Sequence, residues 1–170
     1  MIYRTKTYIA ADWTGDKDAV DKLHDWNNSS RLSLSYTDAH DLTQARDGSL
    51  NCSIKSSLKT RMDASKTFVL IVGSGTRGLT NGSCQYCSSY NSWTKSCTRG
   101  HSIDYRSYIE YECEIAIKAG IELVVLYNAA SVDKSKCPKI MKDKGNHVAM
   151  CYCKDGQLYW DYQAVKNSLS

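Results

Sequence analysis

The sequence has few of the features that mark disordered, secreted or membrane-spanning proteins. Only one of its 170 residues is proline and 24% are charged, which is unlike the composition of disordered chains. No stretch approaches the roughly 18 consecutive apolar residues of a membrane span. The first residues, MIYRTKTYIAADW, lack the long apolar segment of a signal peptide. These absences predict a folded, cytoplasmic protein without a membrane partner.

Basic residues exceed acidic residues only slightly, and they are scattered along the chain. The formal net charge is +4. The densest basic group, residues 134–144, is diluted by Asp133 and Asp143, which is typical of a solvated surface rather than of a nucleic-acid patch. We therefore expect no nucleic-acid partner. A chain of 170 residues is long enough to form one domain with a sizeable core.

Cysteine, by contrast, is abundant, with eight residues in the chain. Without a secretion signal, cysteines are more often reduced thiols or metal ligands than disulfides. A segment rich in Ser, Asn and Cys, at about residues 79–102, contains the spacing C-x2-C-x9-C-x3-H. Four ligands at such spacings predict a structural zinc site that braces the segment, and the alternative is a set of free thiols beside an unrelated histidine. The four candidate ligands are Cys84, Cys87, Cys97 and His101.

Short apolar runs alternate with segments of helical periodicity. The helices are predicted at residues 16–26, 50–64 and 102–120, with a last short one ending at Ser168, and Ser102 or Asp104 would cap the third. This order predicts an α/β fold, a flavodoxin-like open sheet of about five parallel strands with helices on both faces. The strands are predicted at Lys6 to Ala11, Leu32 to Tyr36, Thr67 to Val72, Leu123 to Tyr127 and His147 to Tyr152.

The third of these helices is unusually acidic. Glu114 lies four residues before Lys118, which suggests an exposed ion pair. Glu112 has no basic residue three or four positions after it, and it shares a helix face with Tyr105 and Tyr108. The Glu112 carboxylate is therefore either a charge at the helix edge or a functional acid.

A glycine-rich turn, residues 73–78, follows a buried strand and matches G-x-G-x-x-G. Loop-forming residues follow it instead of a helix, and it comes after the third strand rather than the first, so a Rossmann dinucleotide site is not predicted. Ligands of doubly wound sheets bind outside the carboxyl ends of the strands, where the strand order reverses. In the order 2-1-3-4-5, the residues predicted to line this crevice are Asp12, Trp13, Ser74, Tyr108 and Glu112.

Three segments, IAADWTGDKD, TFVLIVGSGT and YIEYECEIAIKAGIELVVLYN, resemble the TIR-like domains, in particular the branch containing the TIR-like sensor of the bacterial Thoeris anti-phage system. The resemblance covers about residues 7–128. TIR enzymes carry an aromatic residue, usually Trp, four residues before a catalytic Glu, then a small residue four after it and a Gly before the next strand. Tyr108, Glu112, Ala116 and Gly120 stand at these positions. The chain departs from the pattern in its Tyr and in the long cysteine-rich insertion.

This resemblance implies that Glu112 cleaves the nicotinamide–ribose bond of NAD, with NAD as the substrate and no required cofactor. Water capture gives ADP-ribose, and internal capture gives a cyclic ADP-ribose isomer. The Thoeris-like branch implies the cyclic product, a diffusible signal that activates a separate effector protein, and TIR domains also self-associate. Asp12, Trp13 and Ser74 would bind the nucleotide, and Tyr108 would lie near the nicotinamide or support Glu112. His40 and Arg46 fall in the loop that often gates TIR sites.

Three other functions are compatible with the same fold. The chain would be a non-catalytic interaction module if Glu112 were only a charge at the helix edge. A phosphoacceptor receiver domain needs an Asp where Gly73 and Ser74 stand, which argues against it. A nucleoside deoxyribosyltransferase-like enzyme shares both the fold and the glycosidic chemistry. In each case the sequence predicts one domain over residues 1–170 with an insertion at about 79–102.

Overall fold

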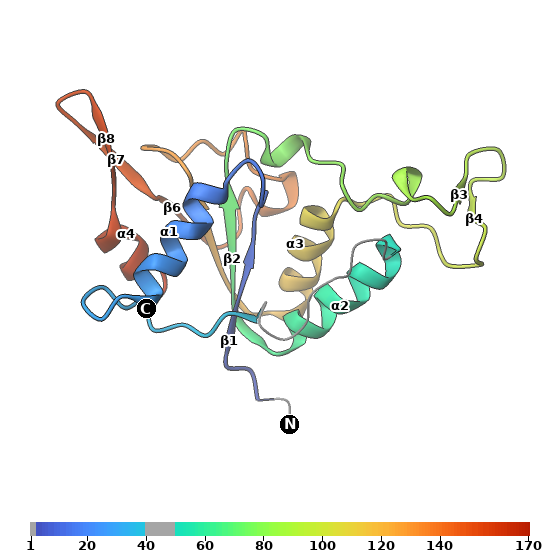
Figure 1. Ribbon diagram of the computed structural model, residues 1–170, viewed down its shortest axis with the longest axis horizontal. Coiled ribbons are helices and arrows are strands. Elements are labelled where there is room, and N and C mark those ends of the chain that lie inside the picture. The colour runs from blue at the N-terminus through green and yellow to red at the C-terminus, as the bar shows by residue number, and fades with distance from the viewer. Residues whose placement is uncertain (1–2, 40–49) are drawn as a thin grey trace.

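The computed structural model describes residues 3–39 and 50–170, and a parallel sheet in the order β1-β2-β5-β6 lies at its centre (Figure 1). The helices α1 and α4 cover one face of this sheet, and α2 and α3 cover the other. The predicted α/β class with helices on both faces is therefore confirmed. None of the helices described is long and apolar enough to cross a membrane. The sheet strands are β1 (Lys6–Ala10), β2 (Ser65–Val72), β5 (Glu122–Tyr127) and β6 (Asn146–Ala149), and the α-helices are α1 (Lys17–Asn28), α2 (Asn51–Asp63), α3 (Tyr108–Ala119) and α4 (Tyr162–Ser168).

The two faces of the sheet bury two separate apolar clusters, because successive side chains of a strand point to opposite faces. Ile9, Val69 and Val124 are neighbours in register and face α1 and α4. Tyr8 and Phe68, one residue earlier on their strands, face α2 and α3. Burial on both faces explains why these strands read as continuous apolar runs.

The strand predicted at Leu32 to Tyr36 does not form. The backbone N–H and C=O of Tyr36 both bond to the side chain of Asn27, at 3.0 and 2.9 Å, so this residue is not available for a sheet ladder. Ser35 has a positive φ of 56°, which a strand does not accommodate. In the described part of the chain, the edge of the sheet beside β1 carries only an isolated bridge from Thr7 to Asp38. The sheet thus has four strands where about five were expected.

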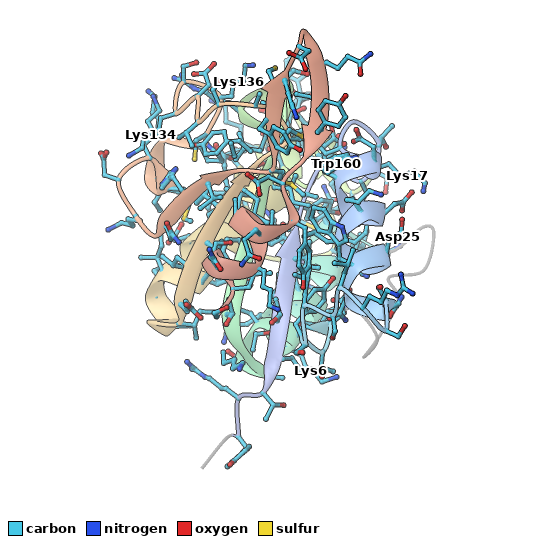
Figure 2. The ribbon with its side chains drawn as sticks, turned by 90° about the vertical axis from the view of Figure 1, so that its left-hand side faces the viewer. Lys6, Lys17, Asp25, Lys134, Lys136 and Trp160 are labelled. Carbon is cyan, nitrogen blue, oxygen red and sulfur yellow. The ribbon has the colours of Figure 1, made fainter. Side chains whose placement is uncertain are left out.

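The strand predicted at His147 to Tyr152 divides in two at the buried residue Met150. Its first half is β6, and its second half joins the antiparallel hairpin of β7 (Cys151–Lys154) and β8 (Gln157–Trp160). The amide of Met150 bonds to the carbonyl of Tyr127 on β5 at 2.8 Å, while its own carbonyl accepts from the amide of Asp161. Trp160 lies at the foot of the hairpin (Figure 2). It packs edge-on against Trp26 of α1.

The helix predicted over residues 102–120 begins later than expected. Its N-cap is Ser107, not Ser102 or Asp104, and it forms a capping box with Glu110. The Ser107 hydroxyl accepts from the Glu110 amide at 3.1 Å, and the Ser107 amide donates to the Glu110 carboxylate at 2.8 Å. Gly120 ends the helix in the left-handed conformation, as its position predicted.

The insertion between β2 and α3 projects from the side of α2 and α3, at the opposite end of the molecule from the β7–β8 hairpin (Figure 1). It is built of short turns and of one hairpin whose two strands have two residues each. Its pieces are the 3-10 turns η2 (Thr76–Gly78) and η3 (Cys84–Tyr86) and the strands β3 (Tyr90–Asn91) and β4 (Ser96–Cys97). A further 3-10 turn, η4 (Lys139–Met141), follows β5.

Candidate functional site

A cavity of about 260 Å³ lies between the carboxyl end of β1, the helix α2, the segment after β2 and the first turns of α3. Four of the five residues predicted to share a crevice line it: Asp12, Trp13, Tyr108 and Glu112. The fold brings them together because side chains of β1 pack in the same apolar cluster as α2 and α3. The cavity is somewhat smaller than the roughly 300–1,000 Å³ typical of small-molecule sites.

Glu112 is a buried carboxylate that faces this cavity. It is 5% exposed, and its Oε1 accepts a hydrogen bond of 2.5 Å from the hydroxyl of Tyr8, which is itself fully buried on β1. Burial raises the pKa of Glu112 to about 7, although the Tyr8 hydrogen bond and the nearby cation Arg61 oppose this shift. Near neutral pH the site therefore holds a carboxylate that is close to half protonated, in a setting where its charge is weakly screened.

Tyr108 forms the wall of the cavity beside Glu112, and both α2 and the insertion position it. Its hydroxyl donates to the Asn51 side chain of α2 at 3.1 Å, and its amide donates to the carbonyl of Asn81 at 2.7 Å. Gly82 lies against the Tyr108 ring with a φ of 96°, and a Cβ there would come within 2.6 Å of the ring. Only glycine fits at that position, because both the conformation and the ring exclude a side chain.

Asp12 and Trp13 border the cavity where β1 ends. The Asp12 carboxylate accepts from the Thr14 amide at 3.1 Å, which holds the loop in a tight turn. The side chain of Trp13 is 46% exposed. An exposed aromatic face beside a buried carboxylate is suited to stacking on a flat heterocyclic ring.

Ser74, the fifth residue predicted for the crevice, lies elsewhere. It lines a separate hollow of about 210 Å³ between the carboxyl ends of β1, β2 and β5. Asp16 also lines that hollow. Its carboxylate accepts a hydrogen bond from Asn128 at 3.0 Å and lies so close to Gly73 that a Cβ would not fit there. Ser74 is therefore not brought into the cavity of Glu112, because the first residues after β2 lie beside the segment that follows β5.

Glu110 and Glu114 serve other purposes on the opposite flank of α3. Glu110 caps the helix, and Glu114 accepts from Arg106 at 2.6 Å and from Lys118 at 2.5 Å. These bonds, that of Lys118 first, lower the pKa of Glu114. A larger hollow of about 620 Å³ borders this flank. The carboxylates that line it are Glu110, which is held in the capping box, and Glu114, which is paired with Arg106 and Lys118, so neither is a counterpart of the buried Glu112.

All four predicted zinc ligands line one small cavity. A fifth residue, Cys52 of α2, lines it as well, and no spacing rule applied to the insertion alone finds a residue that lies so far away in the sequence. Within residues 3–39 and 50–170, no three His, Cys, Asp or Glu side chains lie close enough together to hold a metal ion as they stand. Zinc at Cys84, Cys87, Cys97 and His101 stays a prediction.

Sequence reasoning missed three residues of the main cavity and its surroundings: Tyr8, Arg61 and Asn81. Tyr8 carried no signal, because a tyrosine within an apolar strand is typical core. Arg61 is 5% exposed on α2, and nothing in the apolar pattern of that helix singled it out. Two further residues named for the site, His40 and Arg46, lie outside the described residues.

Residues 8–80 match the family described as the Thoeris protein ThsB, TIR-like domain. No curated protein matches the chain. The matched segment contains β1, α1, α2 and β2, and with them Tyr8, Asp12 and Arg61. Glu112 and Tyr108 lie beyond it, so their roles depend on the geometry and not on the match.

Proposed function

We propose that this chain, a TIR-like protein of the Thoeris ThsB family by its match over residues 8–80, cleaves the bond between nicotinamide and ribose in NAD. The observation that carries the proposal is the buried Glu112 carboxylate, which faces a cavity with an exposed indole at its rim. A cavity of about 260 Å³ suits one half of a dinucleotide, with the remainder extending along the surface.

Glycosidic cleavage of NAD develops positive charge on the ribose. The C1′–N bond breaks with its electron pair going to the pyridine nitrogen, which leaves as neutral nicotinamide and creates an oxocarbenium-like centre. The ionised Glu112 stabilises that centre, since a fixed carboxylate in a water-poor cavity interacts more strongly than one in water. Tyr8 donates to Oε1 and so fixes the orientation of the carboxylate.

The fate of the cation determines the product. Capture by water gives ADP-ribose and a proton, and capture by a hydroxyl or ring nitrogen of the same molecule gives a cyclic ADP-ribose isomer with no water added. The Thoeris family supports the cyclic product, a diffusible signal in anti-phage defence that a separate effector protein reads. NAD is then a substrate, and no cofactor is needed. Asp12 and Trp13 would bind the nucleotide, and Tyr108 would bound the nicotinamide end.

Mass spectrometry of NAD incubated with the purified chain tests the proposal. We expect Glu112→Gln to lower nicotinamide release at least about 100-fold, since it removes the charge that stabilises the transition state. Glu114→Gln is the matched control, two residues away on the same helix, and it should retain activity. High protein concentration favours the assembly that TIR domains use.

Three outcomes would contradict the proposal or redirect it. Wild-type turnover by Glu112→Gln would refute the role of this carboxylate. Turnover of 2′-deoxynucleosides in place of NAD would indicate a deoxyribosyltransferase-like enzyme. Inactivity of every variant, together with concentration-dependent self-association, would indicate an interaction module.

A further inference from the structure

The cysteine-rich insertion has almost no apolar core of its own. Of its hydrophobic side chains only Cys84 is buried, while Trp93 is 95% exposed and Tyr86 is 63% exposed. Small loop-rich units of this kind need a covalent or metal crosslink, because apolar burial alone does not offset the entropy of ordering the chain. All eight cysteines of the chain are free thiols in the structure, so no disulfide supplies the crosslink.

Four thiols from three separate segments converge where the insertion meets α2. Cys52 comes from the first turn of α2, Cys84 and Cys87 from around η3, and Cys97 from β4. They line a cavity of about 10 Å³, which is the room of one water-sized sphere. Half of the cysteines in the chain therefore line one small space, although their side chains as they stand are too far apart to hold a metal ion.

The backbone around Cys84 is arranged as a sulfur-binding turn. The Cys87 amide donates to the Cys84 carbonyl at 2.9 Å, which closes the C-x-x-C segment into a tight turn. The Asp104 amide donates to the Cys84 sulfur at 3.2 Å. An N–H directed at sulfur stabilises a thiolate more than a thiol, and such outer hydrogen bonds commonly support metal-bound cysteine.

The structure favours Cys52 over His101 as the fourth ligand. Cys52 and the other three cysteines are at least half-buried, whereas His101 is exposed at the mouth of the cavity. The spacing of residues within the insertion predicted His101 as the fourth ligand. A pattern confined to the insertion cannot include Cys52, which belongs to α2.

We propose that Cys52, Cys84, Cys87 and Cys97 hold a structural Zn²⁺ that ties the insertion to α2. On binding, the four thiols release their protons to solvent and rotate inward to a tetrahedral set with Zn–S distances of about 2.3 Å. Asn51, which bonds to the Tyr108 hydroxyl, directly precedes Cys52 in the chain. The ion therefore also holds the Tyr108 wall of the main cavity.

The test measures metal binding by the full chain with any affinity tag removed, under reducing conditions. We expect one zinc per chain by mass spectrometry of the native protein. Replacing zinc with Co²⁺ should give the thiolate-to-cobalt charge-transfer absorption of a sulfur-rich tetrahedral site. Cys52→Ser and Cys87→Ser should weaken Co²⁺ binding at least about 10-fold, since each removes one of four ligands. His101→Ala and the matched surface control Cys153→Ser, on β7, should bind as the wild type does.

Three results would overturn the assignment. The first is a chain that stays metal-free after it is loaded with Zn²⁺ in reductant. The second is a Cys52→Ser variant that folds but binds Co²⁺ at wild-type affinity, and the third is loss of binding in His101→Ala together with that retention, which would restore the histidine set. Far-UV circular dichroism of each variant identifies unfolding. These readouts do not depend on NAD cleavage, so the zinc site and the proposed function fail separately.

Discussion

The two flanks of α3 place the same kind of side chain in opposite environments. On the cavity flank, Glu112 is buried beside the neutral hydroxyl of Tyr8, and its pKa rises to about 7. On the solvent flank, two residues further along, Glu114 accepts from Arg106 and Lys118, and its pKa falls. The local sequence Glu-Cys-Glu is almost symmetric. Only the tertiary neighbours decide that one carboxylate is suited to chemistry and the other to an ordinary surface ion pair.

The largest expected difference between the flanks is in stability, measured as the free energy of unfolding. A carboxyl group with a raised pKa in the folded state contributes stability that is present below its unfolded pKa and is lost as pH rises through about 7. Glu112→Gln removes the titrating group, so stability should no longer fall as pH rises through this range. The amide oxygen of the glutamine still accepts a hydrogen bond from Tyr8. We expect the variant to be more stable than the wild type at pH 8 by roughly 1–3 kcal/mol, since one pKa unit is worth about 1.4 kcal/mol.

Urea unfolding of the wild type and Glu112→Gln at pH 5 and pH 8 measures this effect. The difference should nearly vanish at pH 5, where the wild-type carboxyl is protonated and neutral. A variant that is destabilised equally at both pH values would show that Glu112 contributes to folding through a hydrogen bond rather than through an unfavourable buried charge. It would also remove the contrast between the two flanks.

Tyr8 is expected to have the next largest effect. Tyr8→Phe removes the 2.5 Å bond to Oε1 of Glu112 and should cost about 1–2 kcal/mol of stability, since a buried acceptor loses its donor. That bond lowers the pKa of Glu112, so its loss should raise the pKa further. Under the proposed function, NAD cleavage should rise with pH as Glu112 ionises, and in Tyr8→Phe this rise should shift to more alkaline pH.

The matched control for this variant is Tyr127→Phe. Tyr127 is also fully buried in the sheet, and its hydroxyl bonds to His147 at 2.8 Å, remote from Glu112. Its loss should cost a similar free energy of unfolding and leave the pH profile of cleavage where it was. Equal shifts of the profile in both variants would indicate a general loosening of the sheet rather than a positioning role for Tyr8.

The sequence predicted most of the central sheet because apolar runs are a strong and local signal. It placed β1, β2 and β5 correctly, and the lack of a basic partner singled out Glu112, which is buried and lines the main cavity. It failed at Tyr36, where a side chain nine residues away, that of Asn27, takes both backbone hydrogen-bonding groups. Alternation of apolar residues cannot reveal such competition for the backbone.

Sequence reasoning missed several residues that line or border the cavities, and it missed them for a common reason. Tyr8 meets Glu112 across 104 positions of sequence, and a tyrosine in an apolar strand looks like packing. Cys52 stands alone on α2, so no motif includes it. Conversely, Ser74 was expected in the crevice because it follows a central strand, and the direction in which the turn bends is a tertiary property. Residues far apart in the sequence complete this site, so short motifs recover only its centre.

The smallest effect is expected on the solvent flank. Glu114→Gln removes two hydrogen-bonded ion pairs, yet Arg106 keeps Asp104 as a partner at 2.8 Å. Because Glu114 is partly exposed and water screens its charge, we expect a loss of at most about 0.5 kcal/mol, smaller still in high salt. Its lowered pKa means that this stability is present near neutral pH and is lost as pH falls through that pKa. Urea unfolding at low and high salt measures it, and a loss that is large and independent of salt would place Glu114 among the groups that fix α3.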